Sequence, residues 1–489
     1  MSDKVNRRNF MKTAGLATGV MAVASHIPFS YAQNSKVNVG CVGTGGQGSF
    51  HVRDGLSGAT DIQIVAVTDV YGPHQKLGVQ LARISNAKIY LDPGQQLTDA
   101  QKQKAMAAYK PQGYYDYRKM LESETLDAVI IATPLHTHYQ IVMDALDAGK
   151  HVFCEKTMCY EIEQARDIVM KCHEKNLFVQ VGHQRRYNPL YNKALMMVRQ
   201  EGVIGRLNHI DAQWHRNNDW RRPINTDHVI TPEEAPFIQD LEHHMNWRLY
   251  QATSRGLMTE LATHQLDIAA WFLDCLPKRV YGCGGLDYWR DGREIDDNVN
   301  LIYEFELDQN SRGYYAINAR SSYQDKVAIN NPYSVRLMYS SITANAKKGC
   351  SELIEGDEGT LELTEEGSFY YQEPTSKVSW GGQGSGSPSA EQAATVVTSG
   401  GTLKLSNKAQ QEGKPITVDN DKSVDQLQFI RFSEDIKNGG MPKANQIVGL
   451  NATIMAMSGF TAIAEKRTVE IDPAWYTFDF PTPDPGVVS

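Results

Sequence analysis

The residues best suited to proton transfer in this sequence are two acids and a histidine, spaced along one predicted helix. Glu260, His264 and Asp267 occupy positions i, i+4 and i+7 of a segment that continues as IAAWFL, so an α-helix places them on one face. A histidine exchanges protons near neutral pH, and a neighbouring carboxylate fixes its tautomer. Taken alone, such a histidine is more often a salt-bridged surface group.

A lysine supplies a second reactive group. Lys156 follows His151 to Cys154, a predicted buried strand. An ammonium group at a strand end can donate a hydrogen bond to a reacting oxygen and stabilise its developing charge. We therefore predict Lys156, His264 and Glu260 as catalytic residues, with His264 taking a proton from a substrate hydroxyl.

A glycine motif predicts the cofactor. Gly43, Gly45 and Gly48 form GxGxxG after the apolar run Val37 to Val42, a pattern that allows a tight turn, close approach of a pyrophosphate and helix packing. Asp69 ends a second strand about 20 residues later, where a carboxylate accepts hydrogen bonds from the adenosine ribose and repels a 2′-phosphate. NAD is therefore favoured over NADP. The predicted cofactor-binding residues of this stretch are Gly43, Thr44, Gly45, Gly46, Gln47, Gly48 and Asp69.

Three further predicted strands, Asp127 to Ala132, His151 to Cys154 and Phe178 to Gly182, also end in polar clusters. In a parallel sheet the carboxyl ends of the strands line the ligand crevice. The loops that follow these strands add Thr133, Pro134, His138, Glu155, Lys156 and Gln184 to the predicted cofactor site.

Tryptophan and arginine gather between the two reactive clusters, in Gln213 to Arg222 and Asn246 to Tyr250. Aromatic rings cover the C–H faces of sugars, and arginine forks bind their hydroxyls. Any single one of these aromatics packs equally well in its own domain, but the set predicts a sugar or polyol substrate. The predicted substrate-binding residues are Arg185, Tyr187, Trp220, Trp247, Arg248 and Asp267. Glu242 to His244 lacks a third ligand at metal spacing, so no metal is predicted.

The chain of 489 residues, with 41% hydrophobic residues and a net charge of -8, has room for two domains. Without a basic cluster, this acidic balance disfavours nucleic acid and anionic membranes as partners. Leu77 to Lys110 is predicted as an insertion with a helix near Asp99 to Ala108. Alternating runs from Val299 to Tyr371 predict antiparallel strands, and two C-terminal helices, Val424 to Lys437 and Asn445 to Glu465, are expected to pack back on the first domain.

The N-terminus resembles an export signal. Asn6 to Lys12 contains a twin arginine, Ala14 to Ala24 is a short apolar core, and Ser30 to Ala32 is a small-x-small cleavage site. Twin-arginine signals export folded proteins, and the apolar core is too short for a membrane span. We expect residues 1–32 to be removed, a periplasmic location and no stable membrane insertion; an uncleaved anchor or a disordered N-terminus is the alternative.

The order of these motifs resembles the glucose–fructose oxidoreductase, inositol dehydrogenase and MocA superfamily. The resemblance rests on Gly43 to Gly48, the AVTD run ending at Asp69, Ala148 to Lys156, and the Glu260/His264/Asp267 pattern, together with Ala132-Thr133-Pro134 and His138. It implies an α/β fold: an N-terminal Rossmann domain, placed at 33–160, and a C-terminal α/β domain, 161–489, with an open, mostly antiparallel sheet. The exposed sheet face commonly forms dimers or tetramers, so a homo-oligomer is expected.

Two positions depart from the superfamily pattern. Thr157 replaces the usual proline of Glu-Lys-Pro, and Glu260 replaces the usual aspartate.

Export constrains the mechanism, because no nicotinamide pool exists outside the cytoplasm. The cofactor is then expected to stay tightly bound and to be reset in place. One function is an oxidoreductase acting on a sugar or glycoside hydroxyl, with C3 of a glycoside as one version. The alternative is an NAD-dependent glycosidase of the same superfamily that oxidises C3 transiently; those enzymes typically lack the lysine, so Lys156 favours net dehydrogenation. A nucleotide-retaining sensor is a third reading, disfavoured by the intact catalytic set.

Overall fold

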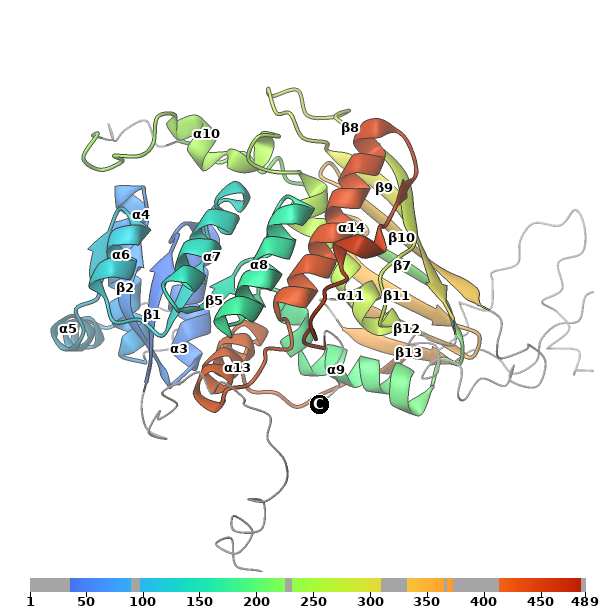
Figure 1. The fold of residues 1–489 in the computed structure, drawn as a ribbon, viewed down its shortest axis with the longest axis horizontal. Coiled ribbons are helices and arrows are strands. Elements are labelled where there is room, and N and C mark those ends of the chain that lie inside the picture. The colour runs from blue at the N-terminus through green and yellow to red at the C-terminus, as the bar shows by residue number, and fades with distance from the viewer. Residues whose placement is uncertain are drawn as a thin grey trace, which may run out of the picture. The chain divides into compact units, whose positions relative to one another are not determined.

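Six parallel strands form the first sheet of a computed structural model that describes residues 36–88, 97–224, 231–308, 332–364, 367–372 and 413–484. Their order is β3-β2-β1-β4-β5-β6, so the chain reverses direction across the sheet between β1 and β4, where a crevice opens at the carboxyl ends. This confirms the predicted Rossmann fold (Figure 1). The strands are β1 (Val37–Val42), β2 (Ile62–Thr68), β3 (Gln112–Tyr114), β4 (Ala128–Ile131), β5 (His151–Cys154) and β6 (Val179–Val181).

Helices connect these strands. Helix α2 (Gly46–Phe50) begins within the glycine turn, which is the GxGxxG motif Gly43 to Gly48. Together with a π-helical turn, η1 (His51–Gly55), and α3 (Leu56–Gly58), it forms one continuous helical segment. The later helices are α4 (Gly72–Asn86), α5 (Asp99–Ala108), α6 (Tyr117–Ser123), α7 (His138–Asp147) and α8 (Ile162–Lys175).

The predicted insertion at Leu77 to Lys110 is wrong in its first part, because α4 continues to Asn86. Its buried face uses small and polar residues, which weakens the apolar pattern. Asn86 accepts a hydrogen bond from the Ile64 amide and donates one to the Ile64 carbonyl, both at 2.8 Å, and so ties α4 to β2.

The parallel sheet also extends beyond the predicted domain boundary at residue 160. Strand β6 pairs with β5 in parallel, and α8 lies between them in the chain, so the first domain includes residues up to Val181. A short 3-10 turn η3 (Gln184–Tyr187), helix α9 (Pro189–Met196) and a π-helical turn η4 (Met197–Glu201) then lead to the second sheet.

The second sheet has nine strands in the order β14-β13-β12-β11-β7-β10-β9-β8-β15. Every neighbouring pair is antiparallel except β7 and β10, which confirms the mostly antiparallel prediction. The strands are β7 (Leu207–His215), β8 (Arg279–Gly285), β9 (Asn298–Leu307), β10 (Tyr333–Ile342), β11 (Cys350–Gly356), β12 (Gly359–Thr364), β13 (Ser368–Gln372), β14 (Lys414–Pro415) and β15 (Val469–Glu470). Of the predicted strand region Val299 to Tyr371, residues 309–331 and 365–366 lie outside the described residues, as does the predicted export signal at 1–32.

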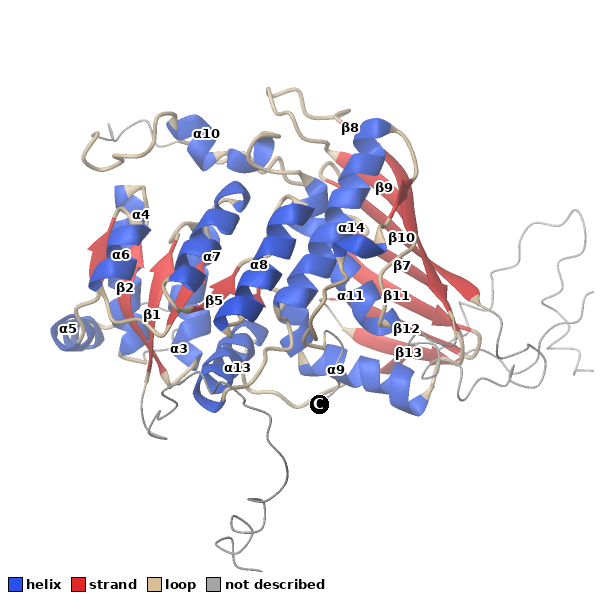
Figure 2. Cartoon of the chain, viewed as in Figure 1, coloured by secondary structure: helices blue, strands red, loops and turns tan. Residues whose placement is uncertain are grey.

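Alternate residues of these strands build the core of the second domain. On β9, Val299, Leu301, Tyr303, Phe305 and Leu307 are buried and pack in one cluster with residues of η6, a π-helical turn (Met258–Ala262), of α11 (Thr263–Leu273) and of α14 (Gln446–Glu465). Figure 2 shows α14 beside α8, and α8 packs in one cluster with β5 and β6 of the first sheet. Helix α11, which carries His264, is thus fixed by its packing on the second sheet.

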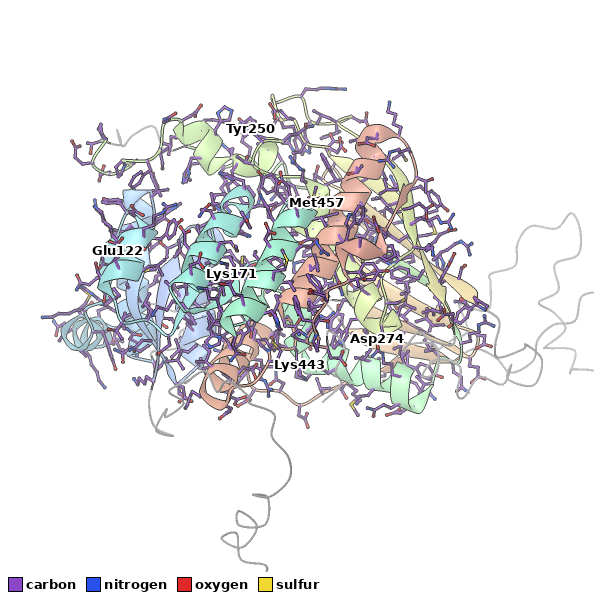
Figure 3. The ribbon with its side chains drawn as sticks, in the orientation of Figure 1. Glu122, Lys171, Tyr250, Asp274, Lys443 and Met457 are labelled. Atoms are coloured by element: carbon purple, nitrogen blue, oxygen red, sulfur yellow. The ribbon has the colours of Figure 1, made fainter. Side chains whose placement is uncertain are left out.

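The C-terminal helices return to the first domain, as predicted. Helix α13 (Val424–Asn438) begins with a capping box between Ser423 and Gln426, and its Phe429 and Phe432 pack in one core cluster with Phe153 of β5. Helix α14 contacts both α8 and α11; Met457 and Lys171 mark α14 and α8 in Figure 3.

Helix α14 is the one helix of the described residues that is long and apolar enough to cross a membrane. In this fold 67% of that apolar stretch is buried inside the protein. The apolar character of α14 therefore matches its position as a core helix between the two domains.

Candidate active site

A cavity of about 1070 Å³ lies at the carboxyl ends of the first sheet and reaches residues of both domains. It brings together most of the predicted site. The predicted residues that line it are Gly43, Gly45, Gly46, Gln47, Asp69, Thr133, Pro134, His138, Glu155, Lys156, Gln184, Trp220, Trp247, Arg248, Glu260 and His264.

The glycine turn shows why its glycines are required. Gly43 has a φ of +84°, and a Cβ on Gly48 would lie 1.8 Å from the Gly43 carbonyl oxygen. A Cβ on Gly45 would meet only the ring of His74, at 3.6 Å, so the backbone there is open to close approach. These properties fit a bound pyrophosphate.

Two predicted cofactor residues, Thr44 and Gly48, support the turn without lining the cavity. The buried Thr44 donates its amide to Oδ2 of Asp69 at 2.7 Å and its hydroxyl to the His74 carbonyl at 2.9 Å. Asp69 also accepts the Tyr71 amide at 2.9 Å through Oδ1. Each carboxylate oxygen accepts more than one hydrogen bond, so Asp69 can hold the turn and still receive ribose hydroxyls. The residues present therefore fit NAD.

The reacting half of the cavity is assembled by contacts between the domains. The Lys156 ammonium group donates to the Glu260 carbonyl at 2.6 Å, and the Thr157 hydroxyl donates to the Thr259 carbonyl at 2.8 Å. Both acceptors belong to the π-helical turn η6. The Lys156–Thr157 peptide bond is cis, so a cis turn is present here with threonine in place of proline. The loop after β5 is thereby hydrogen-bonded to the turn that carries His264.

His264 is held as a neutral imidazole. Burial, together with the charges of Lys156 and Arg185, lowers its pKa well below the ordinary value. Its Nδ1 is buried and has no hydrogen-bond partner among the described residues, and the Trp214 ring lies 5.4 Å away, centre to centre. A neutral imidazole in a cavity can accept a proton from a substrate.

Burial also lowers the pKa of Lys156, and the Arg248 and Arg216 charges act in the same direction, while Glu260 and Glu155 oppose them. Glu260 itself does not orient His264 as predicted. Its Oε2 accepts from Nε of Arg248 at 2.7 Å. The carboxylate therefore neutralises an arginine of the cavity wall.

Asp267 does not belong to the cavity, which corrects the sequence prediction. Its carboxylate is buried and accepts from the equally buried Arg186, with Oδ1 2.7 Å from Nη2. Asp267 follows His264 by three residues in α11, and the physical reason for its absence from the cavity is that the buried Arg186 engages both of its carboxylate oxygens.

Arg185 and Tyr187 were also predicted to bind substrate, and neither lines the cavity. Arg185 forms an ion pair with the buried Glu352, which also accepts from the Tyr191 hydroxyl at 2.8 Å. The Tyr187 hydroxyl accepts from the Ala444 amide at 3.2 Å. These contacts place both side chains in the packing between helices and strands and not in the cavity.

Two buried histidines that face the loops have positioning contacts. His138 places Nδ1 2.9 Å from the Thr157 carbonyl and Nε2 2.9 Å from the Thr133 carbonyl, so it joins the loops after β4 and β5. His51 lies 2.6 Å from Oε1 of Glu155. Burial alone would raise the pKa of Glu155, but the His51 hydrogen bond and the Lys156 charge outweigh it and lower that pKa.

Sequence reasoning missed His51, because its partner lies 104 residues away. It also missed cavity-lining residues of the segment between β7 and η6, which carries α10 (Leu241–Met245). Phe237, Ile238 and His244 line the cavity, although nothing in their local sequence marks them as part of a site.

The tryptophans form one wall of the cavity. Trp214, Trp220 and Trp247 all line it, and the Arg248 guanidinium lies 4.3 Å from the centre of the Trp247 ring. Trp220 has a φ of +60°, an unusual backbone state for a large residue. Flat apolar faces beside arginine donors are the surfaces that bind sugar rings.

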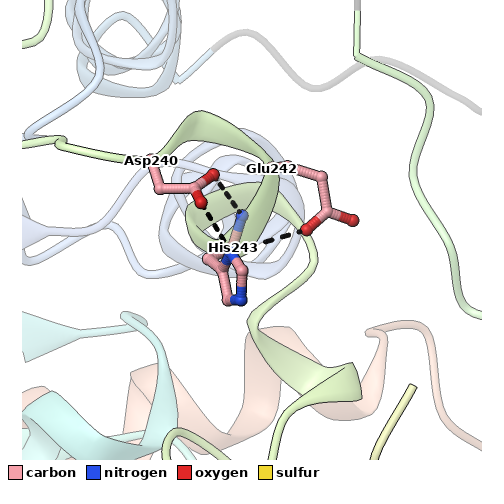
Figure 4. A group of neighbouring side chains, drawn as sticks. All are labelled: Asp240, Glu242 and His243. Carbon is pink, nitrogen blue, oxygen red and sulfur yellow. Dashed lines mark hydrogen bonds and ion pairs between the residues drawn. The ribbon is translucent and has the colours of Figure 1, made fainter. Parts of the chain in front are cut away.

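A cluster on α10 has donor atoms at metal-binding separation: Asp240, Glu242 and His243 lie within 4.8 Å of one another (Figure 4). His243 Nδ1 is 2.7 Å from Oδ2 of Asp240. Glu242 is engaged by the Arg221 guanidinium and the Tyr250 hydroxyl. Both carboxylates are therefore already hydrogen-bonded by protein side chains.

Known proteins match this arrangement. The family model "Oxidoreductase family, NAD-binding Rossmann fold" of GFO/IDH/MocA matches residues 37–183, and the "GFO/IDH/MocA C-terminal domain" model matches residues 193–330. The two models together cover more than half of the chain. An inositol 2-dehydrogenase/D-chiro-inositol 3-dehydrogenase of Lactiplantibacillus plantarum is 26% identical over 251 residues, 50% of this chain and 54% of the relative.

Two further relatives bear on the chemistry. A levoglucosan dehydrogenase of Pseudarthrobacter phenanthrenivorans is 25% identical over 211 residues, 39% of this chain and 49% of the relative. A glycosyl hydrolase family 109 protein of Shewanella baltica is 24% identical over 272 residues, 52% of each chain. The chain thus spans about half the length of the curated relatives it matches.

Solved structures share the fold over most of the chain. A levoglucosan dehydrogenase in complex with NADH superimposes with a TM-score of 0.59 at 15% identity, covering 90% of this chain and 100% of that chain.

Proposed function

The chain belongs to the GFO/IDH/MocA oxidoreductase superfamily, and from this premise we propose that it is an NAD-dependent oxidoreductase acting on a hydroxyl of a sugar, polyol or glycoside. One observation carries the proposal: Lys156 and His264 line the same cavity as the glycine turn, and Lys156 is bonded to the turn that precedes His264. The names of the relatives, inositol and levoglucosan dehydrogenases, support this substrate class.

In the proposed reaction, His264 accepts the proton of the substrate hydroxyl while the carbon bearing that hydroxyl loses a hydride and becomes a carbonyl. Bound NAD supplies the hydride acceptor. The lowered pKa of His264 keeps the ring neutral and ready to accept a proton at neutral pH.

Lys156 stabilises the oxygen on which negative charge develops. An ammonium group has three N–H donors, and one of them is held by the Glu260 carbonyl. No second acceptor for this ammonium group is found among the described residues, so the remaining donors can meet the substrate oxygen. Because the π-helical turn fixes the ammonium group, this interaction needs little reorganisation during the reaction.

We also propose that NAD stays bound between turnovers and that the protein is exported to the periplasm through its twin-arginine segment. A cofactor that cannot exchange must be reset in place, for example by reduction of a second, keto-sugar substrate. The exposed face of the nine-stranded sheet is the proposed surface for homo-oligomer formation.

A glycosidase is the second candidate, supported by the similarity to the glycosyl hydrolase family 109 protein of Shewanella baltica. In that reaction C3 of a glycoside is oxidised transiently and no net oxidation remains. Lys156 favours the dehydrogenase, because the superfamily resemblance implies that such glycosidases typically lack this lysine.

The test mixes the purified holoprotein with a panel of glycosides, sugars and inositols, and follows the absorbance of reduced cofactor together with released aglycone. Reduction of bound NAD without release supports the oxidoreductase. Release without net reduction supports the glycosidase instead. If neither signal appears with any member of the panel while the protein retains NAD, the proposed substrate class is wrong.

A further inference from the structure

The described parts of the segment between β7 and η6, residues 216–224 and 231–257, include contacts with the first domain. The Gly72 amide, at the start of α4, donates to the Glu234 carbonyl at 2.6 Å, and the Glu234 carboxylate pairs with Lys76 at 2.9 Å. Figure 1 shows α10, which this segment carries, beyond the ends of the helices of the first domain. Residues of the second domain therefore reach the nucleotide half of the cavity.

Arg222 lies on this segment, directly against the glycine turn. A Cβ on Gly46 would be 3.0 Å from Nη2 and 3.3 Å from Nη1 of Arg222. The backbone of Arg222 is fixed by the buried Asn246, whose Oδ1 accepts the Arg222 amide at 2.7 Å and whose Nδ2 donates to the Arg222 carbonyl at 3.3 Å. These two hydrogen bonds fix the backbone from which the guanidinium group extends.

Arg222 has no acidic partner among the described residues. Its guanidinium has no hydrogen bond or ion pair with the residues that the structure describes, and it lines the cavity. Burial and the neighbouring Arg248 charge lower its pKa. The adjacent Arg221 differs, because Glu242 and Asp291 both pair with it. An unpaired cation beside a phosphate-binding turn provides a favourable site for an anion.

We propose that Arg222 is a phosphate ligand of the bound dinucleotide, contributed by the second domain, so that the pyrophosphate lies between the glycine turn and the guanidinium group. The inference rests on the nucleotide site of the proposed function and is independent of which hydroxyl is oxidised. A guanidinium fork binds two phosphate oxygens at once. The contact slows release of the cofactor, because leaving requires separation from both domains.

The same chemistry would serve a 2′-phosphate of NADP, and the geometry favours the pyrophosphate. Arg222 approaches Gly46 of the turn, whereas the ribose position belongs to Asp69, whose carboxylate repels a 2′-phosphate. Comparing NADH with NADPH separates the two sources of phosphate.

The experiment measures the affinity of NADH, NADPH and ADP-ribose for the nucleotide-depleted full-length protein and for Arg222→Ala, Arg222→Lys and Arg221→Ala. Loss of a charge-assisted hydrogen bond to phosphate predicts that Arg222→Ala weakens NADH and ADP-ribose binding by roughly 10- to 100-fold. Arg222→Lys keeps part of the affinity, and Arg221→Ala keeps the wild-type value. The salt dependence of NADH binding becomes shallower in Arg222→Ala, because one screened charge contact is gone.

Unchanged NADH affinity in Arg222→Ala overturns the inference, as does a loss confined to NADPH. An equal loss in Arg221→Ala also overturns it, since the effect then comes from the segment and not from the guanidinium group. A wild-type protein that binds no NADH refutes the nucleotide site of the proposed function itself. Circular dichroism confirms that each variant is folded.

Discussion

The two halves of the cavity are built in different ways. The nucleotide half consists mainly of backbone turns in the first domain: the glycine turn, with Thr44 and Asp69 joined behind it by a hydrogen bond of 2.7 Å. The reacting half exists only where two domains meet, because Lys156 and Thr157 bond to carbonyls of η6. Most of the nucleotide-binding surface thus comes from the first domain, whereas the reactive groups are positioned by contacts between distant stretches of chain.

The largest expected effect separates chemistry from binding. His264→Ala removes the proposed base, and we expect turnover to fall by about 10²- to 10⁴-fold, while NADH affinity stays at the wild-type value. Rapid mixing with substrate and a separate NADH titration measure the two quantities. His173→Ala is the control, because this histidine stacks on Phe480 far along α8. A joint loss of NADH binding in His264→Ala would show that the halves are not separable.

The converse substitution acts on the nucleotide half. Asp69→Ala removes the acceptor for the ribose and for the Thr44 and Tyr71 amides, so we expect NADH affinity to fall by roughly 10-fold or somewhat more. At saturating NADH the turnover should be nearly unchanged. Asp147→Ala, on the surface, is the matched control. Wild-type NADH affinity in Asp69→Ala would place the ribose elsewhere.

The smallest effect tests the contact between domains. Thr157→Val keeps the side-chain shape and removes the hydroxyl that donates to Thr259. Loss of this buried hydrogen bond should lower the free energy of unfolding by about 1 kcal/mol and reduce turnover a few-fold, with NADH affinity unchanged. Denaturant unfolding and steady-state kinetics measure both. Thr137→Val, whose hydroxyl bonds within its own loop to Thr133, should leave turnover closer to wild type; a larger loss there would refute the role of the interdomain bond.

The difference between the two halves of the cavity explains which parts of the fold and the site could be predicted from the sequence. Most residues of the glycine turn, Asp69 and the strand-end loops do line the cavity, because short-range patterns determine a Rossmann unit, and their binding of a cofactor stays a prediction. Helix α4 was missed in part, since its buried face includes Gly78 and polar residues. The alternation of β9 and β10 indicated the antiparallel sheet, whereas its strand order depends on long-range pairing.

The role of Asp267 could not be predicted, because its partner Arg186 lies 81 residues away in the chain. Glu260 lies in the π-helical turn before α11, which leaves no clear mark in the sequence, and its partner is Arg248 rather than His264. Arg185 looked like a substrate ligand because of its type and its place after β6. Only the packing reveals that Glu352, from a strand of the other sheet, takes its charge.

Helices α13 and α14 have a consequence for how this chain can be divided. They come last in the sequence, yet a Cβ on Gly55 of the first domain would lie 2.7 Å from the Phe429 ring, and one on Gly449 would lie 2.7 Å from Val181. A fragment ending after β6 would lack both helices and expose the apolar surface they cover. The nucleotide-binding unit is therefore not an excisable module, and a ribosome must finish the chain before that unit has its complete core.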